Sequence, residues 1–210
     1  MDETLAEKIY THKKNTLVSE AFVFAAQAHA EEFRKGTEIP YIVHPAEAAA
    51  IAAGLLLEKS LADRLEGDPN EVIAAAVLHD TLEDTATTDE DLIITFGENV
   101  AKLVLQESEN RRFGQPIQDG WEIRKQETIE RIANTDDIRV KIVCFSDKLA
   151  NLRAIYRDYC NLGDKLLERF NQHDPQKHAW YYRSILESCP ELKDTAAYEE
   201  YEALLAKGFF

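Results

Sequence analysis

The sequence predicts an all-α fold in a single domain. Apolar residues recur at helical spacing along most of the chain, as in TLVSEAFVFAAQAHAEEFRK at 16–35. The only β-like run is RVKIVCF at 139–145, and the residues after it return to helical spacing. With 210 residues, 45% of them hydrophobic and 30% charged, the chain can bury one sizeable core without disulfides. We therefore expect 1–210 to form one helical domain.

Each expected helix begins or ends at a capping or breaking residue. The first expected helix follows the apolar run that begins at residue 16, and it stops at GTEIP. Pro45 suits the first position of the second expected helix. Asp68 can cap a third helix, which carries EVIAAAVLHDTLED through residue 84. The further helices are expected over about 89–106 with Gly97 as a weak point, 121–133, 137–158, 175–189 and from 194 onward.

Charge and cysteine content exclude several functional classes. The net charge of −15 opposes general binding to nucleic acid, although a cation in one pocket would still admit a small anionic ligand. Three cysteines without metal-ligand spacing indicate reduced thiols and a cytoplasmic location. The N-terminus has no apolar signal-peptide core, and AAAIAAGLLL falls well below the ~20 residues of a membrane span. The sequence leaves the oligomeric state open.

An acidic and imidazole cluster ends the third expected helix. In VLHDTLEDT at 77–85, the residues His79, Asp80, Glu83 and Asp84 directly follow an apolar run. At helical spacing they share one edge, at the negative end of the helix, where carboxylates are unfavourable without a cation. A solvated helix end is the ordinary alternative. We favour a metal site because the cluster begins where burial ends.

Two other positions complete a ligand set. His44 stands before a proline at a helix start, and Asp147 and Asn151 lie four residues apart after an apolar run. His44, His79, Asp80 and Asp147 would supply two imidazoles and two carboxylates. Neutral imidazole and carboxylate oxygen suit Mn²⁺, Fe²⁺, Zn²⁺ or Mg²⁺. Four ligands on a six-coordinate ion leave room for water and a substrate oxygen.

The order H…HD…D resembles the HD superfamily of metal-dependent phosphohydrolases. FRKGTEIPYIVHPAEAAAIAAGL and AAAVLHDTLEDTATT are similar to the RK…G…PYI.HP and AALLHDxxEDT segments of RelA/SpoT-type hydrolase domains. FGENVAKLV and VKIVCFSDKLANLRAI resemble motifs further along those domains, so the resemblance covers about 20–157. We expect no synthetase domain beyond the C-terminal helices over 158–210, so the chain is similar to a stand-alone small alarmone hydrolase.

The resemblance implies a function for most of the polar residues. It implies an all-helical HD bundle that removes the 3′-pyrophosphate of guanosine tetra- or pentaphosphate with one Mn²⁺. Glu83 and Asp84 match the catalytic carboxylates, which position a metal-activated water or accept its proton. The metal ligands implied are again His44, His79, Asp80 and Asp147. The expected substrate-binding residues are Arg34, Lys35, Tyr41, Asn151, Lys148 and Arg153, although Asn151 can instead support a ligand and Arg153 can be a structural salt-bridge partner.

The segment at 105–126 departs from the RelA/SpoT pattern, which there has a GVTK-like stretch. The nucleotide preference is therefore open at this point, and Arg111 and Arg112 are either phosphate contacts or part of a solvated loop. In DPQKHAWYYRSIL we expect an aromatic core face.

Two other functions remain as alternatives: an HD phosphohydrolase of another nucleotide, such as a nucleoside monophosphate, or a non-catalytic nucleotide-binding HD module. The complete ligand set argues against the second.

Overall fold

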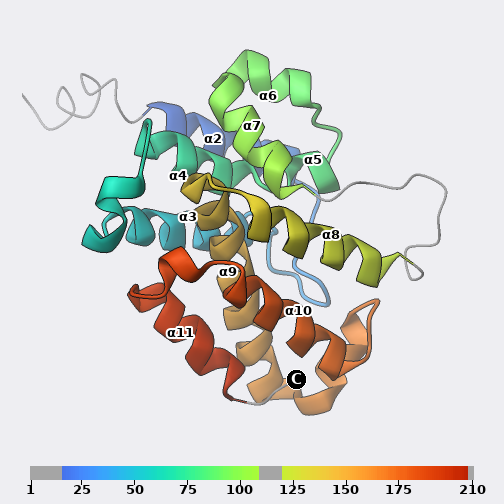
Figure 1. Ribbon diagram of the computed structural model, residues 1–210. Coiled ribbons are helices and arrows are strands. Elements are labelled where there is room, and N and C mark those ends of the chain that lie inside the picture. Colours follow the sequence, from blue (N-terminus) through green and yellow to red (C-terminus); the bar gives the residue numbers. More distant parts are fainter. Residues whose placement is uncertain (1–15, 109–119, 208–210) are drawn as a thin grey trace, which may run out of the picture.

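The computed structural model describes residues 16–108 and 120–207, and within them the protein is built from helices joined by turns and loops (Figure 1). Its α-helices are α2 (Thr16–Ala28), α3 (Val43–Leu56), α4 (Pro69–Leu78), α5 (Thr81–Asp84), α6 (Asp89–Phe96), α7 (Glu98–Glu107), α8 (Trp121–Asn134), α9 (Ile138–Leu162), α10 (Pro175–Glu187) and α11 (Ala196–Leu205). The 3₁₀ helices are η2 (Lys59–Arg64), η3 (Gly163–Arg169) and η4 (Pro190–Leu192). Within these residues the chain forms one isolated bridge, between Phe33 and Pro40, and no strand, which confirms the predicted all-α class.

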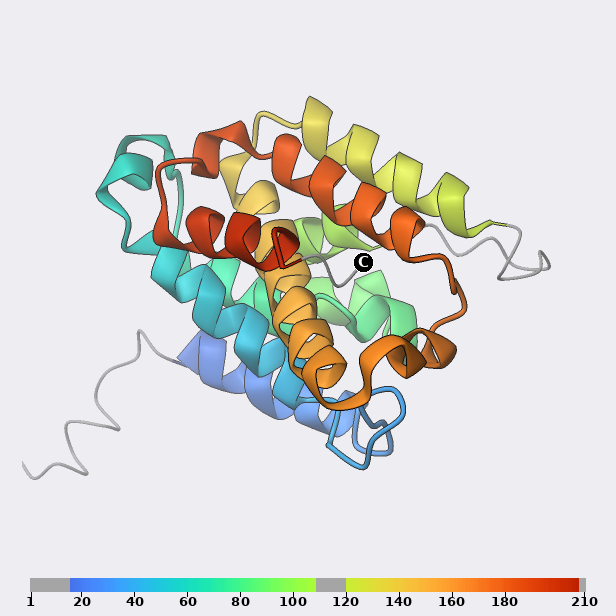
Figure 2. The same ribbon diagram turned by 90° about the horizontal axis from the view of Figure 1, so that it is seen from below.

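The long helix α9 runs through the middle of the molecule (Figures 1 and 2). It packs against α3, α4 and α7 and also against α10 and α11. Asp137 caps its first turn by accepting a hydrogen bond from the backbone N–H of Arg139, and Gly163, with φ +58°, ends it. The fully buried side chains of its apolar stripe lie three or four residues apart and are Ile142, Phe145, Leu149 and Leu152. The β-like run is therefore part of a buried helix, where packing overrides propensity.

Helix α4 is enclosed by α2, α3, α7 and α9. Its Ala74, Ala75 and Ala76 are completely buried, and such small side chains let neighbouring helices approach closely. The C-terminal end of α4 therefore lies deep in the molecule, near the start of α3 and the middle of α9. Polar residues placed at these three points are brought together by the fold.

The expectation of one helix from 69 to 84 is wrong. Helix α4 ends at Leu78, and a separate single turn, α5, starts at Thr81. The hydroxyl of Thr81 donates to the carbonyl oxygen of Leu78 at 2.7 Å, which occupies an acceptor that a continuing helix would give to a backbone N–H. His79 and Asp80 thus lie in a turn between two helices.

Gly97 separates α6 from α7 within the expected helix over 89–106. Its φ of +87° and ψ of 167° belong to a backbone region that is essentially restricted to glycine. The Gly97→Ala variant should lose about 1–3 kcal/mol of unfolding free energy from backbone strain alone, because an added Cβ would meet no atom within 4 Å. Urea denaturation measures this loss.

Gly54 provides the matched control for that experiment. It lies within α3, and an added Cβ there also meets no atom within 4 Å. Since this glycine is helical, Gly54→Ala should instead stabilise the protein by about 0.5–1 kcal/mol. Equal effects of the two substitutions would contradict the strain at Gly97.

None of the described helices has the length and apolar character needed to cross a bilayer. The buried apolar side chains of this part of the chain form one core cluster. The single-domain organisation over 1–210 stays a prediction, because residues 1–15, 109–119 and 208–210 lie outside the described part.

Candidate metal centre and its cavity

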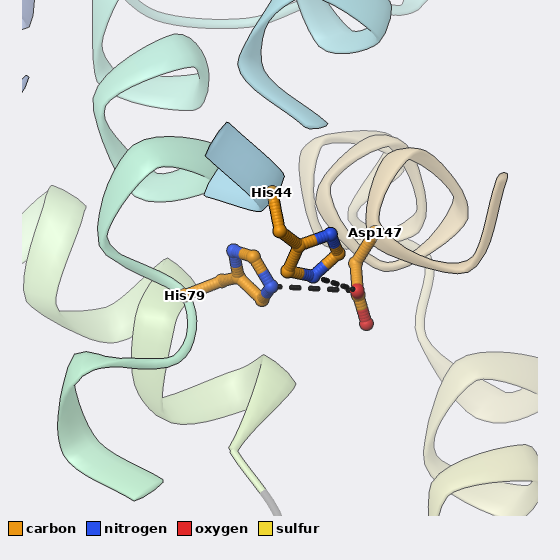
Figure 3. Close-up of side chains that lie close together, drawn as sticks. All are labelled: His44, His79 and Asp147. Atoms are coloured by element: carbon orange, nitrogen blue, oxygen red, sulfur yellow. Dashed lines mark ion pairs between the residues drawn. The ribbon is translucent and has the colours of Figure 1, made fainter. Parts of the chain in front are cut away.

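The expected metal ligands meet where α3 begins, α4 ends and α9 passes. Figure 3 shows the rings of His44 and His79 directed at the carboxylate of Asp147. Asp147 Oδ1 lies 2.9 Å from His44 Nε2 and 3.4 Å from His79 Nε2. Asp80 Oδ2 lies 2.9 Å from His79 Nε2 and 3.5 Å from His44 Nε2. Two imidazoles and two carboxylates therefore converge on one point.

The orientation of the His79 ring indicates that a cation fits at this point. Its Nδ1–H donates to the carbonyl oxygen of Ala76 at 2.8 Å, so a neutral ring directs its Nε2 lone pair at the carboxylates. That buried Nε2 makes no hydrogen bond to any described residue. A lone pair that faces carboxylate oxygens is unfavourable unless a proton or a metal ion lies between them, and the site is therefore suited to a cation. The ligand atoms of His44, His79 and Asp147 all lie within 4.8 Å of one another, which suits one divalent ion.

Burial and charge act in opposite directions on these groups. Burial lowers the pKa of His44 and thus favours its neutral ring. Burial also disfavours a charged His79, but the Asp80 and Asp147 carboxylates outweigh it and raise the pKa of His79 well above its ordinary value. Burial alone would raise the pKa of Asp80, but the neighbouring His79 ring outweighs burial and lowers the pKa of this carboxyl. The carboxylates therefore stay charged and favour a positive charge between them, which a protonated His79 ring or a bound cation can supply.

Tyr41 connects the metal cluster, the group of candidate ligands His44, His79, Asp80 and Asp147, to a neighbouring carboxylate. Its hydroxyl donates to Asp80 Oδ2 at 2.7 Å and lies 3.3 Å from Asp84 Oδ2. Burial and the charges of Asp80 and Asp84 raise the pKa of Tyr41 far above its ordinary value. The hydroxyl thus stays protonated and remains a hydrogen-bond donor.

The two expected catalytic carboxylates occupy different positions. Asp84 lines a cavity beside the metal cluster, whereas Glu83 is half-buried and lies outside the wall of this cavity. Although Asp84 as a whole residue is exposed, desolvation of its carboxyl group, followed by the charges of Asp80 and Glu32, raises the pKa of Asp84 to about 6. A carboxylate with a pKa close to neutrality is suited to accepting a proton.

The cavity has a volume of about 800 Å³ and extends from the metal cluster to α8 and α10. Its wall carries five cationic side chains, Arg34, Lys35, Lys125, Arg157 and Arg169, and four carboxylates, Glu32, Glu47, Asp84 and Asp158. The whole chain has 24 Lys and Arg against 39 Asp and Glu, so the wall is locally enriched in positive charge. This distribution favours an anionic ligand.

Four of the expected substrate-binding residues line the cavity: Arg34, Lys35, Tyr41 and Asn151. Arg34 donates to Asn151 Oδ1 at 3.2 Å, and Asn151 Nδ2 donates to Asp147 Oδ1 at 2.7 Å. Asn151 therefore supports a metal ligand and reaches the cavity at the same time.

Lys148 and Arg153 are not among the residues that line the cavity, and their assignment to the substrate stays a prediction. Lys148 lies behind Asp147 and pairs with Glu107 at 2.8 Å. Arg153 donates to both carboxylate oxygens of Glu200, at 2.7 and 2.6 Å, and thus forms the structural salt bridge that was its alternative role.

The far wall of the cavity contains residues that the sequence did not single out. They come from α8, the end of α9, η3 and α10, and are Trp121, Lys125, Arg157, Arg169, Phe170 and His178. Tyr181 and Tyr182 on α10 are buried, as expected for an aromatic core face, and they also line the cavity. Arg111 and Arg112 lie outside the described residues.

Comparisons with known proteins agree with this geometry. A family model described as "HD domain" matches residues 21–164. The guanosine-3′,5′-bis(diphosphate) 3′-pyrophosphohydrolase of Aquifex aeolicus is 35% identical over 71% of this chain and 20% of its own length. The guanosine-3′,5′-bis(diphosphate) 3′-pyrophosphohydrolase MESH1 of Xenopus tropicalis is 35% identical over 67% of this chain and 70% of its own length. The chain spans about a fifth of the longer curated relatives that it matches.

A solved structure of a metazoan ortholog of SpoT, described as hydrolysing ppGpp, has the same fold. It superposes with a TM-score of 0.64 and 24% sequence identity, over 93% of this chain and 97% of that one. At this identity the similarity bears on the helical architecture alone.

Proposed function

The chain belongs to the HD domain family, and we propose that it hydrolyses guanosine 3′,5′-polyphosphates at the 3′ position, with release of pyrophosphate. The observation that carries the proposal is the buried group His44, His79 and Asp147, with the Asp80 carboxylate in contact with both imidazoles, beside a cavity whose wall carries five cationic side chains. The names of the Aquifex and Xenopus relatives support the same substrate class. We also propose that the chain acts as one domain in the cytoplasm, in keeping with its free cysteines.

In the proposed mechanism, His44, His79, Asp80 and Asp147 hold one divalent ion, which we take to be Mn²⁺. When bound, the ion supplies Lewis acidity to the hydrolytic water and the scissile phosphoryl group. Asp84 accepts the proton of that water, with Glu83 as the second carboxylate of the pair, and the Tyr41 hydroxyl keeps the Asp84 carboxylate in place.

The phosphate-binding residues of the proposal are Arg34 and Lys35, in the loop before α3. The Asn151 amide positions both sides of the site, because it donates to Asp147 and accepts from Arg34. A guanidinium and an ammonium beside the metal cluster offset the charge of a pyrophosphate group.

Tyr41→Phe should lower kcat about tenfold with little change in KM. The substitution keeps the ring but removes the hydroxyl that orients Asp80 and Asp84. Steady-state kinetics at saturating Mn²⁺ measure the effect. Tyr201→Phe is the control, because its hydroxyl donates instead to the carbonyl oxygen of Tyr182. Equal kinetic losses in both variants would contradict the role of Tyr41.

The function itself is tested by incubating the purified protein and Mn²⁺ with ppGpp, beside an Asp80→Ala control. We expect pyrophosphate from the wild type and none above background from the variant. Orthophosphate released from a nucleoside monophosphate, with no pyrophosphate from ppGpp, would point to an HD phosphohydrolase of another nucleotide. Tight nucleotide binding without turnover would point to a non-catalytic module.

A further inference from the structure

Glu107 is a buried carboxylate in an unfavourable place. It is the last residue of α7, at the negative end of the helix dipole, and its side chain is 3% exposed. Its Oε2 atom makes no hydrogen bond to any described residue. A buried carboxylate destabilises the fold unless a nearby charge compensates it. Glu107 also lies in the segment where the sequence departs from the RelA/SpoT pattern.

Lys148 supplies the compensating charge. Its Nζ lies 2.8 Å from Glu107 Oε1 and also contacts Asp147 Oδ2, and its side chain is 12% exposed. Arg131 donates to the backbone carbonyl oxygen of Glu107 at 3.0 Å and so leaves the carboxylate to Lys148. The three charged side chains form a row, Glu107–Lys148–Asp147, that ends at the metal cluster.

The two oxygens of Asp147 have separate partners. Oδ1 faces the two imidazoles and accepts from Asn151, whereas Oδ2 contacts Lys148. Lys148 is therefore close enough to compete with a metal ion for the Asp147 carboxylate. The lysine side chain is flexible and its ammonium is a compact charge, so a second acidic partner restricts where the ammonium lies. Glu107 is that partner, and its charge balances the ammonium.

We infer that Glu107 is a positioning residue of the metal centre: it restrains and neutralises Lys148, so that Asp147 keeps its charge available for the metal. The inference rests on the metal site of the proposed function but not on the identity of the nucleotide. Without Glu107, the Lys148 ammonium would pair with Asp147 alone and oppose the binding of a divalent cation.

Titration of the 210-residue protein with Mn²⁺, followed by the electron paramagnetic resonance signal of the free ion, tests this role. Glu107→Gln should raise the apparent Kd for Mn²⁺ about 10- to 100-fold. The double variant Glu107→Gln/Lys148→Met should return to within about threefold of the wild type, because the competing ammonium is gone. Lys148→Met alone should also bind within about threefold of the wild type.

Unchanged Mn²⁺ affinity in Glu107→Gln would overturn the inference. So would a double variant as weak as the single one, since Glu107 would then act through packing. If Glu107→Gln does not fold by circular dichroism, Glu107→Asp serves instead. Its shorter side chain should weaken binding about tenfold, and Lys148→Met should restore it. A wild type that binds no Mn²⁺ would refute the metal site itself, whereas turnover of another nucleotide would leave the role of Glu107 intact.

Discussion

The Asp147→Asn variant should lose measurable Mn²⁺ binding, and its kcat/KM for ppGpp should fall at least about 10³-fold. Asp147 Oδ1 is the atom that both imidazoles approach, at 2.9 Å from His44 Nε2 and 3.4 Å from His79 Nε2. Asparagine has nearly the same shape but no negative charge. The substitution therefore removes one of the two carboxylate charges of the ligand set while leaving the packing of α9 in place.

Asp158→Asn is the matched control for this experiment. Asp158 lies on the same helix and lines the same cavity, but it pairs with Arg169 at 3.2 Å, away from the imidazoles. We expect its Mn²⁺ affinity to match the wild type by isothermal titration calorimetry. Retained Mn²⁺ binding in Asp147→Asn, or equal loss in both variants, would show that the metal site is misplaced.

Helical periodicity predicted most of the fold because each apolar stripe has local stop signals. Helix α8 was expected over 121–133 and spans Trp121–Asn134. Helix α9 was expected to end near 158 but continues to Leu162, because Gly163 is the residue that ends it. The break at His79 and Asp80 had no such signal: both residues keep right-handed helical backbone angles, and neither is glycine or proline. The break coincides with the hydrogen bond from the Thr81 hydroxyl to the Leu78 carbonyl oxygen.

The convergence of His44, His79, Asp80 and Asp147 could be predicted because these residues are chemically distinctive and lie where apolar runs end. The position of Lys148 follows from helix geometry: one residue beyond Asp147 the side chain is turned by about 100°, toward Glu107 instead of the cavity. Arg153 lies two residues beyond Asn151 and is turned by about 200°. It therefore reaches Glu200.

The far wall of the cavity could not be predicted, because single residues from separate helices form it. The ring of Trp121 on α8 lies 5.6 Å from that of His178 on α10, and Lys125 Nζ lies 4.6 Å from the centre of the Tyr181 ring. These pairs depend on how α8 packs against α10. No local pattern in the sequence reports that packing.

Asp84→Asn should lower kcat by about 10²- to 10⁴-fold without weakening Mn²⁺ binding. Its carboxylate lines the cavity, is held by Tyr41 and has a pKa raised to about 6, so it is placed and poised to take the proton of the hydrolytic water. An amide of the same shape can accept the Tyr41 hydrogen bond but cannot accept that proton. The loss should therefore appear in kcat, with KM and the Mn²⁺ affinity close to those of the wild type.

Two further variants distinguish the role of Asp84 from a general effect of removing a carboxylate and from the role of Glu83. Asp89→Asn alters an exposed carboxylate at the start of α6 and should change neither kcat nor metal affinity. Glu83→Gln should lose less activity than Asp84→Asn, because Glu83 lies outside the cavity wall. Single-turnover kinetics at saturating Mn²⁺ rank the three variants. A greater loss in Glu83→Gln would transfer the proton-accepting role to Glu83, and a parallel loss of Mn²⁺ affinity in Asp84→Asn would make Asp84 a metal ligand instead.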